Sequence, residues 1–267
     1  MTRLGLIAGN GVFPLQVARA ARRYGLEVVA VAHQGETDPA LAELVGAITW
    51  IKVGELQRMV DAFKAAGVTT AAMAGGIARA SLPTAFAPDA RALAMLQRIG
   101  RFSDDAVLRG VAGELEAEGI EIVDPVPMLE DMLARPGVAS GPQPSAAELK
   151  DLALAFTVAR AVGSFDIGQT VAVRDGVVAA IEAVEGTDAA LRRAASLCGP
   201  GLVVAKAAKP GQDLRFDRPA IGPATIELLA EIGAAMIGLE AGTAMLLERE
   251  LILARAQTLS IIVYGYG

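Results

Sequence analysis

The chain has 267 residues, a formal net charge of −6, an apolar content of 53% and only 4% aromatic residues. This length predicts one large domain or two small ones, with a core built from Ala, Val, Leu and Ile. The acidic balance excludes a general nucleic-acid partner, which would require a basic stripe. The single cysteine, Cys198, excludes an internal disulfide and fits the reducing cytoplasm.

Hydropathy predicts a soluble protein. The chain has no uninterrupted run of about 18 apolar residues, and residues 4–8 are too short for the core of a signal peptide. The positive mean hydropathy still leaves room for a lipid pocket or a large subunit interface.

The first half of the chain alternates short apolar runs with helical patterns, which is typical of a parallel sheet covered on both faces. We therefore expect an α/β fold with an N-terminal Rossmann-like domain over residues 1–133. Strands are predicted at 3–8, 27–32, 69–74 and 121–124, and helices at 12–24, 55–66, 83–99 and 104–118.

Residues 134–147 combine three prolines with Gly and Ser, a composition that indicates a linker. A second, mixed α/β domain that carries the catalytic residues is expected over 148–267. Asp175-Gly176 predicts the turn of a β-hairpin. Strands are predicted at 169–176, 177–184, 201–207, 234–241 and 260–265, and helices at 146–162, 187–197, 223–232 and 246–256.

Two glycine loops follow predicted strands in the first domain. Gly9-Asn10-Gly11 opens the first helix, where it either contacts a phosphate through backbone N–H groups or forms a plain tight turn. Pro14 replaces the third glycine of a dinucleotide fingerprint, which disfavours a nicotinamide-dependent oxidoreductase. Gly75-Gly76 ends the third predicted strand, as a ligand contact or as a flexible turn.

Acidic residues mark two further helix starts. Asp104 either caps its helix or accepts hydrogen bonds from ligand hydroxyls or a metal-bound water. The segment Glu185-Gly186-Thr187-Asp188 follows a strand and begins a helix. A helix cap is the simpler interpretation, but we favour a substrate contact because another loop rich in carboxylates lies in the same domain.

That other loop spans residues 205–227, AKAAKPGQDLRFDRPAIGPATIE. Lys206 and Lys209 suit phosphate charge, while Asp213 and Asp217 suit a divalent cation or a water, and phosphoryl transfer needs both kinds of group. Three prolines stiffen the segment, as expected for a preorganised site more than for a surface loop with salt bridges. With one histidine in the chain, these hard oxygen donors favour Mg²⁺.

Several stretches together resemble one known family. They include LGLIAGNGVFP, AGGIAR, DDAVLRG, SFDIGQTVAVRDGVVAAIEAVEGTDAALRRAASL and KAAKPGQDLRFDRPAIGPATIE. In this order and over nearly the whole chain, they resemble the LpxI family, the UDP-2,3-diacylglucosamine pyrophosphatases of lipid A biosynthesis.

The resemblance implies a cytoplasmic, homodimeric, Mg²⁺-dependent hydrolase with peripheral contact to the inner membrane. Its reaction would split UDP-2,3-diacylglucosamine into UMP and lipid X, which is 2,3-diacylglucosamine 1-phosphate. Asp213 and Asp217 would then hold the metal, and Lys209 and Gln212 would serve catalysis. Further substrate contacts would come from Lys206, Arg215, Thr225 and the loops named above.

One position departs from the family pattern. The family keeps aspartate between the proline and the threonine of its last motif, whereas this chain reads Gly222-Pro223-Ala224-Thr225-Ile226. Replacing Asp by Ala removes a metal ligand or a water-orienting base and leaves little steric trace. We therefore expect an inactivated chain that retains its ligand. The alternative is a non-catalytic protein that binds a lipid sugar or a nucleotide sugar.

Overall fold

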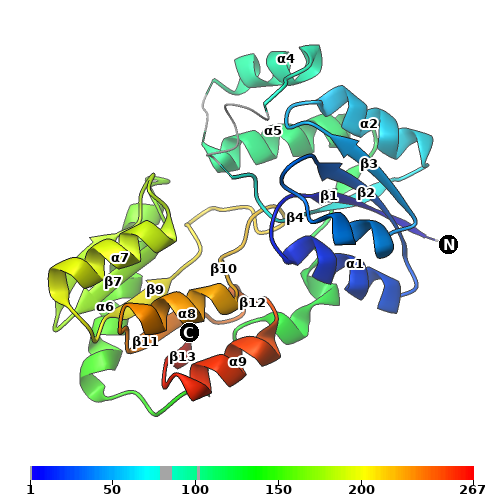
Figure 1. Ribbon diagram of the computed structural model, residues 1–267. Helices are drawn as coiled ribbons and strands as arrows, with labels where there is room; N and C mark the ends of the chain where they lie inside the picture. The colour runs from blue at the N-terminus through cyan, green and yellow to red at the C-terminus, as the bar shows by residue number, and fades with distance from the viewer. Residues whose placement is uncertain (1, 79–85, 101–102) are drawn as a thin grey trace. The chain divides into compact units, whose positions relative to one another are not determined.

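The computed structural model describes residues 2–78, 86–100 and 103–267 (Figure 1). The chain folds into two compact units. Unit 1 comprises Met1–Glu130 and Asp213–Asp217, and unit 2 comprises Asp131–Gln212 and Arg218–Gly267. Part of the 205–227 segment therefore belongs to unit 1, although it lies late in the sequence.

Unit 1 contains a five-stranded parallel sheet in the order β3-β2-β1-β4-β5, which confirms the Rossmann-like expectation. Strand β1 pairs with β2 on one side and with β4 on the other, and its residues from Leu4 to Ala8 are all buried. Such uninterrupted burial is typical of a parallel strand covered on both faces. The strands are β1 Arg3–Ala8, β2 Glu27–His33, β3 Ala47–Ile51, β4 Thr70–Ala74 and β5 Glu121–Ile122.

The helices of unit 1 begin and end where sequence chemistry favours it. Helix α1 has Pro14 in its first turn and two arginines in its last turn, which complement the helix dipole. Asp89 caps α4 by accepting a hydrogen bond from the Ala92 N–H at 2.9 Å. The helices are α1 Phe13–Arg23, α2 Leu56–Ala65, α4 Ala90–Ile99 and α5 Asp104–Ala117, with 3₁₀ turns η1 Pro39–Glu43, η3 Val126–Met128 and η4 Glu130–Met132; η4 crosses into unit 2.

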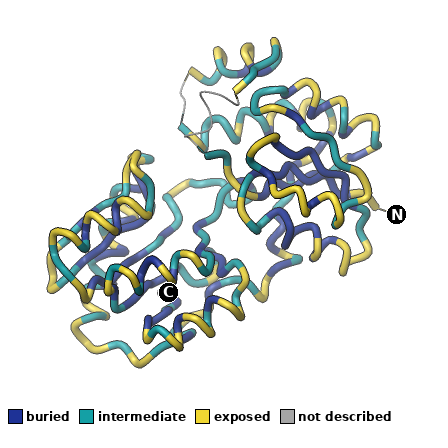
Figure 2. Tube along the Cα trace, in the orientation of Figure 1, coloured by how far each residue is buried: buried dark blue, intermediate teal, exposed yellow. Residues whose placement is uncertain are grey.

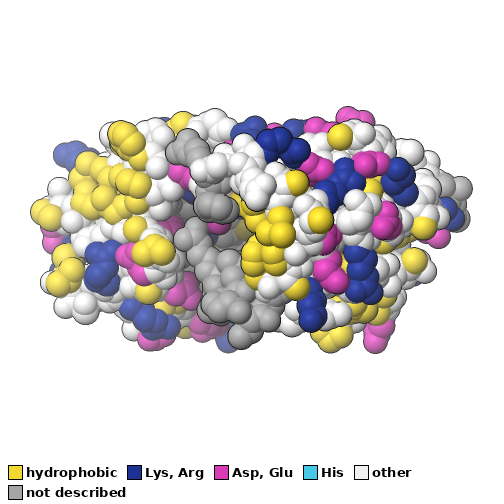
Figure 3. Space-filling view, turned by 90° about the horizontal axis from the view of Figure 1, so that it is seen from above, with side chains coloured by type: hydrophobic (Ala, Val, Ile, Leu, Met, Phe, Trp, Pro, Cys, Tyr) yellow, Lys and Arg dark blue, Asp and Glu magenta, His cyan; other side chains and the backbone are white. Residues whose placement is uncertain are grey.

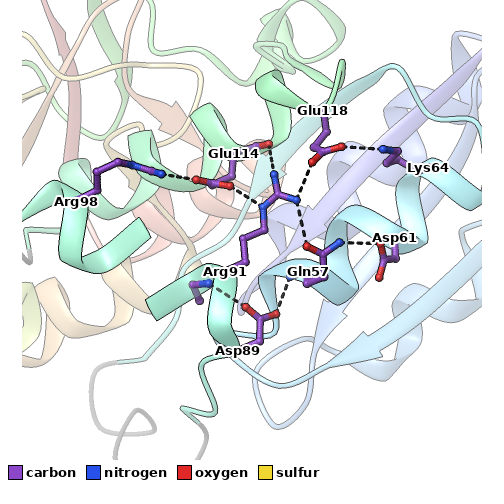
Figure 4. Close-up of polar contacts among 9 residues, drawn as sticks. Gln57, Asp61, Lys64, Asp89, Arg91, Arg98, Glu114 and Glu118 are labelled. Atoms are coloured by element: carbon purple, nitrogen blue, oxygen red, sulfur yellow. Dashed lines mark hydrogen bonds and ion pairs between the residues drawn. The ribbon is translucent and has the colours of Figure 1, made fainter. Parts of the chain in front are cut away.

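An ion-pair network joins α2, α4 and α5 (Figure 4). The Arg91 guanidinium donates to Glu114 Oε2 at 2.6 Å and to Glu118 Oε1 at 2.9 Å. Lys64 pairs with Glu118 at 2.7 Å, and Arg98 also contacts Glu114. Because the Arg91 and Glu114 side chains are only 18% and 12% exposed, this network fixes how α4 packs on α5.

Unit 2 contains a six-stranded mixed sheet in the order β6-β13-β11-β9-β7-β8. The central strands β13, β11 and β9 are parallel, while β6 and the β7–β8 hairpin are antiparallel at the two sides. A separate two-stranded parallel sheet pairs β10 with β12. The strands are β6 Gly137–Ser140, β7 Thr170–Arg174, β8 Val177–Ile181, β9 Val203–Lys206, β10 Ala220–Ile221, β11 Met236–Glu240, β12 Met245–Leu246 and β13 Ile262–Tyr266.

Helices cover both faces of this sheet, and each face has its own buried cluster. Ser145 and Glu148 form the reciprocal hydrogen bonds of a capping box at the start of α6. Figure 2 shows the buried strands in dark blue inside each unit. The helices are α6 Ala146–Gly163, α7 Thr187–Cys198, α8 Pro223–Glu231 and α9 Arg249–Thr258.

The two sheets confirm the predicted α/β fold class. The hairpin predicted at Asp175-Gly176 is also confirmed, because β7 pairs with β8 and both turn residues adopt positive φ. Several elements differ from the predictions. The helix expected over 246–256 begins only at Arg249 as α9, because Leu246 pairs with Ile221 in the two-stranded β10–β12 sheet. Residues 137–140, expected within a linker, form β6 and pair with β13. Of the helix expected over 83–99, residues 83–85 lie outside the described residues, 86–89 are not helical, and α4 begins at Ala90 after the capping residue Asp89. The edge strand β3 was not predicted, since its residues are mostly half-buried.

Candidate functional site

The two glycine loops of unit 1 lie against each other at the carboxyl ends of β1 and β4. The Gly9 N–H donates to Ala74 O at 2.8 Å, and the Asn10 N–H donates to Gly76 O at 2.7 Å. A Cβ on Gly9 would lie 2.2 Å from Gly76 O, and one on Gly75 would lie 2.3 Å from Asn10 O. The glycines are therefore required by close backbone approach, whatever ligand the loops contact.

Glu36 joins these loops to the loop after β2. Its Oε2 accepts hydrogen bonds from Asn10 Nδ2 and from the Ala78 N–H, both at 2.9 Å. Nearby, the buried His33 ring lies 2.9 Å from Ala8 O through Nδ1, which must carry a proton because the carbonyl can only accept. Burial lowers the pKa of His33, so the ring is neutral near pH 7.

Asp104 lies in the first turn of α5, but the helix cap is Ser103, whose hydroxyl accepts from the Ala106 N–H at 3.4 Å. The neighbouring Asp105 pairs with Arg109 at 2.7 Å. Ser103, and not Asp104, therefore caps the helix. Asp104 and Asp105 add negative charge to the first turn, where it interacts favourably with the helix dipole.

The Asp213–Asp217 segment is anchored on unit 1 through Arg215. The guanidinium donates to Asp213 Oδ2 at 2.8 Å, to Ile122 O at 3.1 Å and to Glu116 Oε1 at 3.2 Å. It also lies 4.8 Å above the ring of Phe216, which packs in the unit 1 core. The hydrogen bond from Arg215 lowers the pKa of Asp213, so this carboxylate is ionised.

In unit 2, the parallel strands β9, β11 and β13 end at one sheet edge. Lys206 ends β9 beside Leu239, and Glu240 ends β11. Glu240 accepts from the Ala208 N–H at 2.9 Å and pairs with Arg160 at 2.8 Å. Lys206 thus lies at the carboxyl ends of the parallel strands, which is the edge where open α/β sheets generally bind ligands.

Lys209 is held by the loop that follows α6. Its Nζ lies 2.5 Å from Asp166 Oδ1, and its N–H donates to Gln212 Oε1 at 3.0 Å. The two charged side chains are 19% and 30% exposed. Asp166 adopts a left-handed backbone with φ of 58°, a conformation that is uncommon outside glycine and is found at functional sites.

The turn between β8 and α7 is also ordered by its own side chains. Gly186 precedes α7 with φ of 81°, and the Thr187 hydroxyl donates to Glu182 Oε1 at 2.8 Å. Arg193 hydrogen-bonds Glu185 at 2.6 Å and thereby lowers the pKa of that carboxyl. Asp188 lies exposed in the first turn of α7. The start of the helix explains Gly186, whose backbone has positive φ, and Asp188, whose negative charge suits the first turn. The hydrogen bond to Glu182 fixes the orientation of the Thr187 hydroxyl.

Ala224 lies in the first turn of α8 and is exposed. The Thr225 N–H donates to Gly222 O at 3.0 Å, and the first turn of this described helix contains no acidic residue. An aspartate at 224 would therefore be accommodated at the positive end of the helix dipole without displacing a core side chain.

No group of three or more His, Cys, Asp or Glu residues that could hold a metal occurs within residues 2–78, 86–100 and 103–267. Magnesium in phosphate-handling sites commonly takes one or two carboxylates, with substrate phosphates and waters as its other ligands. Asp213 and Asp217 fit that donor chemistry, although Asp213 is engaged by Arg215.

The structure adds polar residues that the sequence patterns did not single out. Asp166, Glu182 and Glu240 each hold a predicted site residue or the backbone beside it. Their signal was weak, because a lone acid at the end of a strand or helix resembles any solvated residue. Glu36 in unit 1 is a further such residue, since it accepts a hydrogen bond from the side chain of Asn10.

The geometry describes a two-unit α/β protein with glycine loops at one sheet edge and a lysine-bearing loop at the other. Residues 3–132 match the LpxI N-terminal domain family, and residues 135–264 match the LpxI C-terminal domain family. The chain belongs to the LpxI family. It is 37% identical over 278 aligned positions to the UDP-2,3-diacylglucosamine pyrophosphatase LpxI of Caulobacter vibrioides, covering 99% of this chain and 98% of that protein.

Among solved structures, biotin carboxylases share limited similarity. The biotin carboxylase domain of the Hydrogenobacter thermophilus 2-oxoglutarate carboxylase is 18% identical with a TM-score of 0.27, over 66% of this chain and 36% of that one. The biotin carboxylase subunit of pyruvate carboxylase is 15% identical with a TM-score of 0.28, over 74% and 43%. Neither likeness carries a functional conclusion.

Proposed function

We propose that this chain binds UDP-2,3-diacylglucosamine, the substrate named for its Caulobacter relative, and that Ala224 prevents its hydrolysis. The observation that carries the proposal is family membership over nearly the whole chain, combined with an alanine inside an otherwise matching motif. The reaction at issue is attack of water on one phosphorus of the pyrophosphate, which breaks a P–O bond and yields UMP and lipid X.

The residues of the 205–227 segment fit this chemistry. Lys206 and Lys209 would meet phosphate oxygens, and Arg215 would do so if it exchanged part of its contact with Asp213. Gln212 would orient substrate or water from its place beside the Lys209 backbone. The remaining loops would contribute further contacts to the substrate, through Gly9, Asn10, Gly11, Gly75, Gly76, Asp104, Glu185, Gly186, Thr187, Asp188 and Thr225.

Magnesium is the proposed cofactor, with Asp213 and Asp217 as the residues that would hold it. A bound Mg²⁺ would supply charge neutralisation at the phosphates and a more acidic water. Support comes from the oxygen donors and from the pattern of lysines and carboxylates typical of phosphoryl transfer.

The missing group at position 224 is a carboxylate that would orient or deprotonate the water. General-base groups of this kind typically contribute about 10²- to 10⁴-fold to the rate. Because Ala224 is exposed in the first turn of α8, we expect an alanine at this position to leave the fold and substrate binding intact. Substrate retention without turnover is the expected result, which also makes a non-catalytic lipid-sugar binding protein a fair second description.

We further propose a cytoplasmic homodimer with peripheral contact to the inner membrane. Among residues 2–78, 86–100 and 103–267, no helix has both the length and the hydropathy of a transmembrane span, and this finding does not decide the location. Exposed apolar side chains gather on one face of unit 2 (Figure 3). Phe165 and Val184, which are 78% and 81% exposed, lie on the adjacent loops before β7 and after β8. Such loops suit contact with lipid or with the acyl chains of a substrate.

The test compares UMP release by this chain, by Ala224→Asp and by the equally sized Ala224→Asn, each with saturating Mg²⁺ and UDP-2,3-diacylglucosamine. Only Ala224→Asp should gain activity, by at least about 10²-fold. If the unmodified chain already matches Ala224→Asp, the claim of inactivation fails. If no variant hydrolyses or binds this substrate, the substrate assignment fails.

A further inference from the structure

A pocket of about 730 Å³ lies within unit 1 and includes Gly11 of the first glycine loop in its lining. Its lining residues come from the start of α1, the loop after β2 and one residue of β3. Its volume falls in the range of small-molecule sites. The lining residues are Gly11, Val12, Gln34, Gly35, Glu36, Thr37, Asp38, Pro39 and Trp50.

The walls of this pocket are held in place by hydrogen bonds. The Thr37 hydroxyl donates to Ala8 O at 2.6 Å and accepts from the His33 N–H at 3.0 Å. The Gln34 N–H donates to Ile51 O at 2.8 Å, which ties the loop to the end of β3. Glu36 binds the Asn10 side chain and the Ala78 backbone. The pocket is therefore preformed, which reduces the ordering cost of binding.

The charge of the lining selects against phosphate. Glu36 and Asp38 contribute two carboxylates, and none of the described lining residues is Lys or Arg. A phosphate in this pocket would meet like charge without a counter-ion. A ligand with hydroxyl groups is favoured instead, because carboxylates after the second strand of Rossmann-like sheets accept hydrogen bonds from ribose hydroxyls.

Trp50 gives the pocket an aromatic surface. It is the only tryptophan of the chain and is half-buried, and Val12 and Pro39 add two further apolar side chains to the lining. Aromatic side chains bind flat heterocycles by stacking, largely independent of which base is presented. An aromatic residue, two carboxylates and a preformed polar loop together match the two parts of a nucleoside, the base and the ribose.

We infer that this pocket binds the nucleoside portion of the nucleotide-sugar ligand, with Trp50 contacting the base and Asp38 or Glu36 accepting from ribose hydroxyls. The choice of a uracil nucleoside rests on the proposed function. The assignment covers the uncharged nucleoside end of the ligand alone, because none of the described lining residues is a Lys or Arg that could meet a phosphate.

Because Trp50 is the sole tryptophan, its fluorescence reports directly on this pocket. The experiment titrates the full chain with uridine and, separately, with inorganic phosphate. Uridine should change Trp50 emission saturably, whereas phosphate should leave it unchanged over the same concentrations. No saturable change with uridine, or a change produced equally by phosphate, would overturn the assignment.

Calorimetric titration of uridine then compares variants that retain the fold, as checked by thermal melting. Trp50→Ala should weaken uridine binding about 10-fold or more, and Trp50→Phe should retain most of the affinity because a ring remains. Tyr24→Ala, which removes an exposed aromatic residue outside the lining, should bind normally. Unchanged affinity in a folded Trp50→Ala variant contradicts the assignment.

Gln34→Ala gives a second probe should Trp50→Ala fail to fold, since Gln34 is an exposed lining residue. It should weaken uridine binding, and normal affinity in this variant would count against the pocket. The outcome is separable from the proposed function. If Ala224→Asp releases UMP but neither Trp50→Ala nor Gln34→Ala changes the affinity for uridine, the pocket assignment is wrong and the proposed function stands.

Discussion

The two sheet edges of this protein present different chemistry on similar backbones. The edge of unit 1 is built from glycine loops in backbone contact and from acidic residues, whereas the edge of unit 2 presents Lys206 and Lys209. In unit 1 the shape comes from close approach of main chains. In unit 2 it comes from charged side chains held by partners such as Asp166. Fold class alone therefore does not decide what an α/β edge binds.

The largest expected effect tests the backbone contact in unit 1. Gly9→Ala would place a methyl carbon 2.2 Å from Gly76 O, and we expect a loss of about 3 kcal/mol or more in unfolding free energy. Urea denaturation measures it. Gly113→Ala is the matched control, because its Cβ meets nothing within 4 Å inside α5 and should stabilise by about 0.5–1 kcal/mol. Equal stability of the two variants would refute the close contact.

The next effect tests the side-chain character of unit 2. Lys209→Gln removes the charge paired with Asp166 and should weaken binding of lipid X about 10- to 100-fold, the range for a charged hydrogen bond. Surface plasmon resonance or calorimetry measures the affinity. Lys150→Gln, an exposed lysine on α6, should bind normally. Normal affinity for Lys209→Gln would remove this lysine from the site.

A smaller effect tests the network that fixes α4 on α5. Arg91→Met should cost about 1–3 kcal/mol, because it leaves the poorly exposed Glu114 without a main donor. Lys64→Met, at the exposed end of the network, should cost less than about 0.5 kcal/mol.

The same network has a pH signature. The hydrogen bond from Arg98 lowers the pKa of Glu114 below 4.5, so its stabilisation is present above pH 4.5 and is lost as pH falls below that value. The acid-induced loss of stability should therefore be smaller in Glu114→Gln than in the unmodified chain. An identical acid limb in both proteins would contradict the network's role.

The smallest effect concerns His33. Burial lowers its folded pKa below 6.5, so the unfolded chain binds more protons than the folded one once pH drops under 6.5. Stability should be level from pH 8 to 7 and then decline by at most about 1.4 kcal/mol per pH unit. As His33 is the only histidine, His33→Gln should abolish this decline between pH 6.5 and 5.5. A decline that persists in His33→Gln would assign the titration to another group.

Periodicity and turn chemistry were sufficient to predict the Rossmann-like sheet and the β7–β8 hairpin, since apolar runs and the Asp175-Gly176 turn are local signals. They could not predict that Asp213–Asp217 joins unit 1, because that placement depends on Phe216 and Arg215 meeting distant α5 and β5. Strand β6 was not recognisable because it lies between Pro136 and Pro142, and within the described residues it pairs with β13, the last strand of the chain.

The candidate site shows the same division. Lys206 and Lys209 were recognisable from their position after an apolar strand, whereas Asp166 and Glu240 become relevant only through the groups they contact. Pairing of a residue with a partner tens of positions away leaves no mark in local composition.

The central claim is that this chain binds the diacylated nucleotide sugar and fails to cleave it. Native mass spectrometry after incubation with UDP-2,3-diacylglucosamine and Mg²⁺ tests both parts in one spectrum. We predict a complex at the mass of the intact nucleotide sugar for the unmodified chain, and lipid X or free protein for Ala224→Asp. A lipid X complex on the unmodified chain, or no complex at all, would contradict the account.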